Sequence, residues 1–328
     1  MKRRTFLCGL TLGVLAAPRA AVAQTPVKPW RIGVLRIDSP ASEVGAESVS
    51  DLRDGLREHG YQDGTQVRLE VRWAEGKPQR LRELAEELVR LPVDVIVTGG
   101  PHATQAAAEV TRTIPIVMGR MDDVDTHGIV TNLARPGGSV TGLSFQTGDL
   151  SGKWLELLKE AVPKLGRSAV LWDAGGTGRQ VQTIREAAQS LAVELTVLEV
   201  RGVGDFVGAF AAARATKAEA MVMLASPLLT GQTSHLARLA TGSRLPAIYS
   251  HQRFAAAGGL LAYGPGTRDF GWRRAAVFVD KILKGARPGD LPVEQPTRFE
   301  FVVNLKTAKS LGLAIPPSVL ARADQIIE

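Results

Sequence analysis

VDVIVTGGPHATQAAAEVTRTIPIVM, residues 93–118, carries the clearest structural signal in this chain of 328 residues. An uninterrupted apolar run of strand length, residues 93–98, leads into a Gly-Gly-Pro turn. A helical pattern over residues 104–111 then leads into a second apolar run at residues 114–118. Strand, turn, helix and strand in this order predict a parallel βαβ unit.

The same alternation extends on both sides of this unit. Before it, the pattern predicts strands at residues 32–37 and 67–73 and helices at residues 49–59 and 78–91. After a turn cluster at residues 135–138 the alternation restarts, with helices at residues 152–160, 180–192, 206–215 and 235–240 and strands at residues 169–172, 194–200, 220–224 and 247–249. The chain ends with a strand at residues 259–263, a helix at 270–283, a proline-rich connection at 288–296, a strand at 298–303 and a helix after Asn304. We therefore expect an α/β protein with two similar halves that meet near residues 135–150.

The first 23 residues predict an export signal. A basic start (Lys2, Arg3 and Arg4) precedes an apolar run at residues 6–17, and Ala-Val-Ala at residues 21–23 supplies the small-residue cleavage pattern. The arginine pair fits both an ordinary secretory signal and a twin-arginine signal, and both interpretations stay open. Either one predicts a protein that works outside the cytoplasm.

Composition limits the function classes further. Removing the signal leaves 305 residues, enough for two domains, and lowers the net charge from +7 to +3, because four of the basic residues lie in the first 23. This mild excess does not indicate nucleic-acid binding. Cys8, the only cysteine, leaves with the signal, so we expect no disulfide and no thiol chemistry. No later apolar run reaches the length of a membrane span.

Ligands of open parallel sheets bind at the carboxyl ends of the strands, so the turns there are the candidate site. In residues 98–104, two glycines allow backbone N–H groups to approach a ligand, and the helix that follows favours an anion at its N-terminus. The alternative is a glycine-rich turn that only caps a helix. Asp123 is a candidate partner for a ligand amine or hydroxyl, whereas the surrounding acidic cluster fits a calcium loop poorly.

Signatures of catalysis are missing from the sequence. We find no complete phosphate loop, no dinucleotide-binding spacing, no Gly-x-Ser-x-Gly elbow and no zinc-ligand spacing among the histidines. Tyr249, Phe254 and Tyr263 gather late in the chain, where they would either stack on a flat ligand or pack in the core. We expect no cofactor and no metal.

Several long motifs carry a resemblance to a known family. They are LVRLPVDVIVTG (residues 88–99), NLARPGGSVTG (132–142), SGKWLELLKEAVP (151–163) and FEFVVNLKTAKSLGL (299–313). With them, nearly the whole mature chain resembles the substrate-binding proteins of ABC-type uptake systems, in the group related to tryptophan- and tyrosine-binding proteins. The resemblance implies a type I periplasmic-binding-protein fold, with two doubly wound parallel-sheet lobes joined by three crossovers.

The resemblance also implies a domain division. It predicts lobe 1 from residues 30–145 plus 257–287, and lobe 2 from residues 146–256 plus 288–328. The hinges are expected near residues 144–148, 254–258 and 288–296.

The implied function is binding without catalysis. A small organic ligand, amino-acid-like or aromatic, would bind between the lobes of a periplasmic monomer, and a permease would recognise the closed form. The predicted ligand contacts are Ser39, Thr98, Gly99, Gly100, Pro101, His102, Asp123, Phe145, Asp173, Gly176, Ser226, Pro227, Tyr249 and Tyr263. The sequence departs from the family at Asp123-Val124, Asp173-Ala174 and Ser226-Pro227, so the ligand of the relatives is not carried over. A sensory module for a membrane receptor and, less favoured, an α/β enzyme remain as alternatives.

Overall fold

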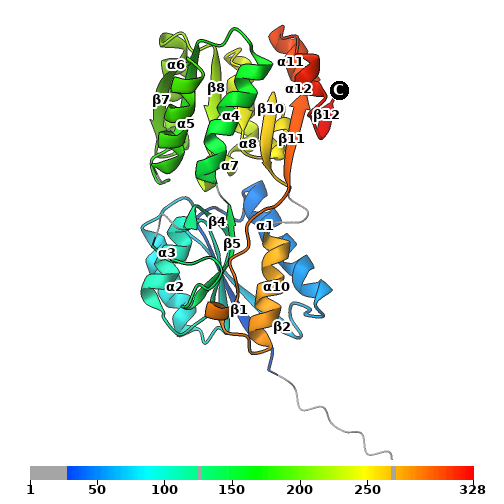
Figure 1. Ribbon diagram of the computed structural model, residues 1–328. Coiled ribbons are helices and arrows are strands. Elements are labelled where there is room, and N and C mark those ends of the chain that lie inside the picture. The colour runs from blue at the N-terminus through cyan, green and yellow to red at the C-terminus, as the bar shows by residue number, and fades with distance from the viewer. Residues whose placement is uncertain (1–27, 125–127, 146, 177, 267–270) are drawn as a thin grey trace, which may run out of the picture.

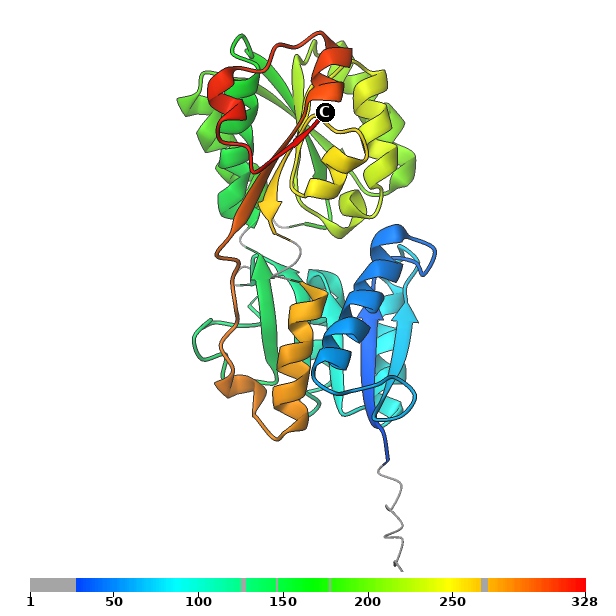
Figure 2. The ribbon, with the colours of Figure 1, turned by 90° about the vertical axis from the view of Figure 1, so that its right-hand side faces the viewer.

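The chain forms two lobes stacked end to end (Figures 1 and 2). The computed structural model describes residues 28–124, 128–145, 147–176, 178–266 and 271–328. The predicted export signal, residues 1–23, lies outside the described residues. Each lobe is built on its own sheet, as the restart of the sequence pattern predicts.

Lobe 1 contains a parallel sheet with the strand order β2-β1-β3-β4-β5. Its strands are β1 (Trp30–Arg36), β2 (Val67–Trp73), β3 (Val95–Gly99), β4 (Ile116–Asp122) and β5 (Val140–Phe145). One face is covered by α1 (Glu43–Glu58) and α10 (Trp272–Leu283), and the other by α2 (Arg80–Arg90) and α3 (Pro101–Val110). All residues of β3 are buried, because helices cover both faces of the sheet, and this explains its continuous apolar sequence.

Lobe 2 contains a larger sheet with the order β12-β11-β10-β9-β8-β6-β7. Only the β10–β11 pair is antiparallel. The strands are β6 (Arg167–Asp173), β7 (Glu194–Val200), β8 (Ala220–Met223), β9 (Ala247–Tyr249), β10 (Leu261–Pro265), β11 (Phe299–Asn304) and β12 (Gln325–Ile327). The helices are α4 (Thr147–Ala161), α5 (Arg179–Ser190), α6 (Phe206–Ala215), α7 (Pro227–Thr230), α8 (Thr233–Gly242), α9 (Gln252–Ala256), α11 (Leu305–Leu311) and α12 (Pro317–Leu320), with a 3₁₀ turn, η2, at Val203–Asp205.

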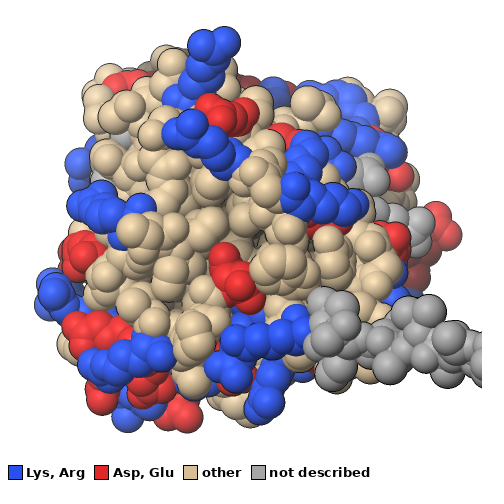
Figure 3. Space-filling model, turned by 90° about the horizontal axis from the view of Figure 1, so that it is seen from below, with Lys and Arg blue, Asp and Glu red and all other residues tan. Residues whose placement is uncertain are grey.

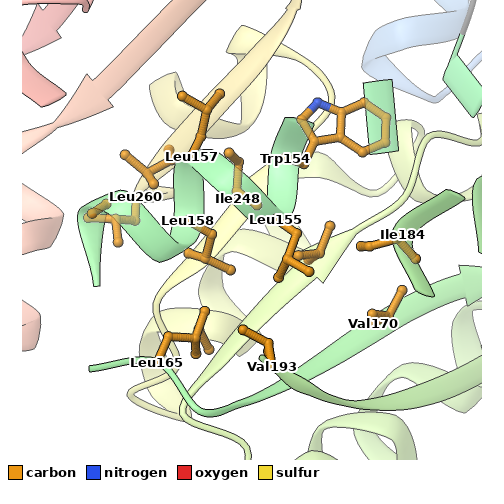
Figure 4. Packing of buried hydrophobic residues seen from close by; sticks show 14 of the residues in the cluster. Trp154, Leu155, Leu157, Leu158, Leu165, Val170, Ile184, Val193, Ile248 and Leu260 are labelled. Carbon is orange, nitrogen blue, oxygen red and sulfur yellow. The ribbon is translucent and has the colours of Figure 1, made fainter. Parts of the chain in front are cut away.

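One core cluster of lobe 2 is centred on helix α4 (Figure 4). Trp154, Leu155 and Leu158 are fully buried and pack with Ile184 of α5. The Trp154 Nε1–H donates to the Tyr263 carbonyl oxygen at 2.7 Å, so its one polar group is satisfied. Burying each such large apolar side chain contributes about 1.5–3 kcal/mol, which makes α4 a firm anchor at the start of lobe 2.

The chain passes from one lobe to the other three times. The crossings lie after β5, after β10 and before β11. The predicted boundaries are wrong at the second and third crossings. The predicted division puts residues 261–265 in lobe 1, but β10 pairs with β9 and β11 in lobe 2, and within the segment 257–287 α10 is the element that returns to lobe 1. The start of the 288–328 segment also belongs to lobe 1, because the 3₁₀ turn η3 (Pro288–Asp290) and Glu294 bond to the loop before β5 and to β5 itself.

The hinge predicted at residues 254–258 is wrong for the same reason. Most of that segment is helix α9 in lobe 2, where the Ala255 carbonyl accepts a hydrogen bond from Asn304 Nδ2. The second crossing instead follows Pro265, and residues 267–270 of it lie outside the described part of the chain. The sequence reading also missed the strands β5 and β12.

Candidate functional site

A cleft lies between the carboxyl ends of the two sheets, and both lobes line it. Lobe 1 contributes strand ends and the loops that follow them, and α10 contributes Trp272. Lobe 2 contributes the N-terminal ends of α7 and α9. The lobes approach each other closely here: a Cβ built on Gly100 would lie 3.0 Å from Cγ of Pro227 in the opposite lobe. The cleft and a narrower pocket beside it both lie where the location rule for open α/β sheets places a ligand.

Arg36 ends strand β1 inside this cleft and is 5% exposed. Its Nε donates to Asp38 Oδ1 at 2.8 Å, and its Nη2 donates to the second carboxylate oxygen. The guanidinium lies over the Trp272 ring, 4.4 Å from the ring centroid. Its Nη1 is buried and has no hydrogen-bond partner among the described residues. Asp38 and the Trp272 ring therefore fix the Arg36 side chain, while its Nη1 group has no partner among the described residues.

Arg120 enters the cleft from β4, two strands away from Arg36. Its guanidinium lies 4.8 Å from the centroid of the Phe145 ring. Burial lowers the pKa of Arg120; Asp122 opposes that effect, and the positive charges of Arg36 and Arg253 add to it. Burial also raises the pKa of Asp122, whose Oδ1 has no partner among the described residues. The two cationic side chains of lobe 1 thus act on each other inside a poorly solvated space.

Lobe 2 adds a third arginine and a histidine. His251 precedes α9, and its Nδ1 accepts from the Arg253 backbone N–H at 3.3 Å. Arg253 extends across the cleft and pairs with Glu47 of α1. Burial holds the pKa of His251 well below its usual range, and Arg120 and Arg253 lower it further. The imidazole is therefore neutral at physiological pH.

The glycine-rich turn after β3 has the position that the sequence predicts. Gly99 and Gly100 line the cleft, and helix α3 begins directly after them. Thr98 is fully buried, and its hydroxyl lies 2.8 Å from the Thr104 hydroxyl, which donates to the Gly100 carbonyl oxygen. A Cβ on Gly99 would lie 2.8 Å from Cζ2 of Trp272, so only glycine leaves room for that ring. Thr98 does not line the cleft, but its hydroxyl contact with Thr104 supports the turn.

A narrower pocket adjoins the cleft and shares Pro227 with it. The structure brings many of the predicted contacts together in these two spaces. Gly99, Gly100, Phe145 and Pro227 line the cleft, while Pro101, His102, Asp173, Gly176, Ser226 and Pro227 line the adjoining pocket.

Asp123 lies just beyond the cleft lining, at the first crossing between the lobes. Its carboxylate accepts from the Gly148 N–H at 3.0 Å and from the Thr147 hydroxyl at 3.1 Å, at the start of α4. Its φ of 44° is a left-handed conformation. Burial raises its pKa to about 6, although the bond from Gly148 acts in the other direction. These contacts join the end of β4 to α4, and a ligand contact of Asp123 stays a prediction.

Three predicted residues lie elsewhere. Tyr249 is fully buried in lobe 2 and stacks on Phe254 with the ring centroids 4.5 Å apart. Tyr263 packs beside Phe299 and the α4 core. The Ser39 hydroxyl accepts from the Ala41 N–H in the loop before α1. None of the three lines the two described pockets, so the aromatic rings at the cleft are Trp272 and Phe145 instead.

Sequence reasoning missed the arginines of the cleft and Trp272. A signal was present, because Arg36 and Arg120 interrupt or end apolar strand runs, where a charged side chain needs a specific partner.

The described residues contain no group of His, Cys, Asp and Glu suited to a metal ion. No described helix is both long and apolar enough to cross a membrane. On the end of lobe 1 away from the cleft, basic and acidic side chains are interspersed (Figure 3).

Two lobes, each with its own sheet, and a cleft shared between them form the architecture of a two-lobed solute-binding protein. The chain belongs to the family of ABC transporter substrate binding proteins, which it matches over residues 34–327. This confirms the family and the fold that the sequence motifs indicate.

Three similar proteins place the chain within this fold. It is 24% identical over 267 residues to the tyrosine-binding protein of Clostridioides difficile strain R20291, covering 79% of this chain and 74% of that protein. It superposes with a TM-score of 0.83 on an ABC domain from Streptococcus pneumonia solved in complex with L-Trp, at 25% identity, covering 92% of this chain and all of that one. The ligand-free, open structure of a substrate binding protein with adhesive properties from Clostridium difficile gives a TM-score of 0.63 at 21% identity, covering 91% and 99%.

Proposed function

We propose that this chain is the periplasmic receptor of an ABC-type uptake system, and that it captures a small amino-acid-like or aromatic ligand by closure of its two lobes. The observation that carries the proposal is the shared cleft, in which Arg36 and Arg120 of lobe 1 face His251 and Arg253 of lobe 2. A ligand that contacts both groups binds the closed arrangement better than the open one. Only this difference in binding free energy drives closure.

The amount of free energy required is modest. Moving the equilibrium from almost fully open to almost fully closed takes roughly 5.5 kcal/mol of preference. Two or three hydrogen bonds to charged groups, at about 1.5–3 kcal/mol each, supply that amount. The cleft offers such donors on both sides. Closure would then present one continuous surface to a membrane permease.

The relatives support the ligand class without naming the ligand. One is named a tyrosine-binding protein, and another was solved with L-Trp. Trp272 and Phe145 give the cleft of this chain apolar, aromatic walls of the kind such ligands contact. We further propose that the receptor acts as a monomer after cleavage of its signal near Ala23, and that it releases its ligand chemically unchanged.

Native mass spectrometry of the freshly purified mature chain tests this proposal. We expect a one-to-one complex with a small organic molecule, and the mass of the released molecule should equal the mass of the molecule that binds again. A molecule that is converted during incubation would contradict a receptor function. So would a complex that survives replacement of lining residues from both lobes, for example in a Trp272→Ala, His251→Ala double variant.

A further inference from the structure

We propose that the ligand is an organic carboxylate, and that Arg36, Arg120 and Arg253, here called the three-arginine cluster, form its anion-binding site. This inference rests on the proposed function and adds the ligand chemistry to it. All three side chains line the same cleft, two from lobe 1 and one from lobe 2. An anion between them contacts both lobes, as a ligand that drives closure must.

The strand register sets the spacing within the cluster. Arg36 of β1 is the register partner of Gly99 in β3, and Gly99 is the partner of Arg120 in β4. Neighbouring strands lie about 4.8 Å apart, so the two arginine backbones are separated by about 10 Å, with a glycine between them. A Cβ at Gly99 would lie 2.8 Å from Cζ2 of Trp272 and 3.4 Å from Nη1 of Arg36, so the glycine lets the ring and the guanidinium lie close to the strand. The two arginines therefore flank the residue that the Trp272 ring covers.

The donors of the cluster are incompletely used by the protein. Nη1 of Arg36 is buried without a partner among the described residues, although the rest of that guanidinium is bonded to Asp38. The Arg120 guanidinium lies against the face of Phe145, and no side-chain hydrogen bond joins it to another described residue. Buried polar groups without partners are costly, and arginine forks match the geometry of carboxylates. A carboxylate between Arg36 and Arg120 would satisfy these donors.

The carboxylates already present do not replace such a ligand. Asp38 bonds to the Nε and Nη2 side of Arg36 and leaves Nη1 unused. Glu47 pairs with Arg253 at the rim of the cleft. Asp122 follows Arg120 on β4 and has an unpartnered oxygen, so it forms no hydrogen bond to the cluster through that atom. Asp51 lines the same cleft, where burial raises the pKa of its carboxyl and the charge of Arg253 acts in the other direction. With these carboxylates in place, the Nη1 group of Arg36 still has no partner among the described residues.

The test uses pairs of compounds that differ only in the charged group. The pairs are indole-3-propionate with its amide, 3-phenylpropanoate with its amide, 4-hydroxybenzoate with its amide, and L-tryptophan with L-tryptophanamide. Thermal shift and calorimetry on the mature chain should show that at least one carboxylate stabilises the protein and binds at least tenfold more tightly than its amide. L-Tryptophan against indole-3-propionate then shows whether an ammonium group adds to binding.

Substitutions locate the effect. Arg36→Gln, Arg120→Gln and Arg253→Gln should each weaken the best carboxylate by about 10- to 100-fold, the range expected for one hydrogen bond between charged groups. Arg201→Gln, at a side chain that is 80% exposed, should leave its affinity unchanged. Because Arg36 is buried and holds Asp38, circular dichroism checks that its variant folds. Arg253 is more exposed, so its variant keeps the test valid if that one does not fold.

Each result decides the question. No preference for any carboxylate over its amide, or unchanged affinity in the folded arginine variants, would overturn the anion site. If an uncharged compound alone binds and makes the protein more compact, the receptor function stands and the three-arginine cluster has another role. If a carboxylate binds through the arginines without any change in compactness, the anion site stands and closure does not.

Discussion

At the scale of single residues, Gly99 decides how the cleft is built. Its hydrogen atom faces the Trp272 ring, and an added Cβ would lie 2.8 Å from the ring edge. We predict that Gly99→Ala displaces Trp272 and, through it, the guanidinium of Arg36. Urea unfolding should show a loss of about 1–3 kcal/mol, the usual cost of overpacking, together with weaker ligand binding.

The matched control is Gly138→Ala. A Cβ at Gly138 meets nothing within 4 Å, so this variant should bind ligand as the wild type does. A Gly99→Ala protein with unchanged stability and affinity would show that the ring is not fixed by this contact.

Asp123 predicts a pH dependence of stability. Its pKa in the folded protein is about 6, above the ordinary 3.8, because burial disfavours the charged carboxylate. Between about pH 4 and pH 6 the folded state keeps a proton that the unfolded chain has lost, so stability falls as pH rises through this window. Relative to Asp123→Asn, the wild type should lose up to about 3 kcal/mol of unfolding free energy across it.

Urea unfolding of both proteins at several pH values measures this difference. Parallel curves for the wild type and Asp123→Asn would show that the carboxylate is ionised with an ordinary pKa.

The sequence predicts part of the site at this scale, and the reason is physical. Turns after parallel strands meet at one edge, so Gly99 and Gly100 could be placed at the cleft from strand order alone, whereas Phe145 was expected only from the family resemblance. Whether a tyrosine faces a cleft or a core depends on tertiary packing, and Tyr249 packs on Phe254 inside lobe 2. The three-arginine cluster combines residues more than 200 positions apart, and no local pattern reveals such a meeting.

At the scale of elements, α10 shows why the lobe boundaries were hard to predict. The helix returns to lobe 1 and packs on α1, where Gly55 allows a close approach: a Cβ there would lie 2.4 Å from the Arg273 carbonyl oxygen. Periodicity predicts the helix itself, with Ala275, Phe278, Val279 and Ile282 on its buried face. It does not say against which sheet that face packs.

We predict that Gly55→Ala destabilises lobe 1 by about 1–3 kcal/mol, because α1 and α10 must move apart. Hydrogen exchange should report faster exchange in α1 and α10 and unchanged exchange in α4 and α5. The control is Gly208→Ala on the exposed side of α6, where nothing lies within 4 Å. That variant should gain about 0.5–1 kcal/mol from helix propensity. Equal effects of both substitutions would argue against a tight α1–α10 contact.

The elements that the sequence missed are short or interrupted. Strand β5 contains Gly142 with φ at 127°, in close contact with the backbone of Met118, and its flanking glycines resemble a loop. Strand β12 is three residues long and pairs only with β11. Long apolar runs such as β3 and the amphipathic α2 were placed correctly, because their pattern alone determines which faces are buried.

At the scale of the whole molecule, the three crossings join two lobes that each have their own sheet and core. The lobes meet through side chains at the cleft, including the Arg253–Glu47 pair and the contact of Gly100 with Pro227. Surface ion pairs contribute only about 0–1 kcal/mol, so these contacts alone hold the two lobes together weakly. A ligand that bridges the lobes is then able to decide between open and closed.

Small-angle X-ray scattering of the mature chain tests this central claim most directly. The radius of gyration would be measured first on protein stripped of small molecules and then at saturation with the compound that binds most tightly. Closure of two hinged lobes predicts a smaller radius of gyration in the saturated sample. Superimposable scattering curves, with calorimetry showing full occupancy, would contradict it.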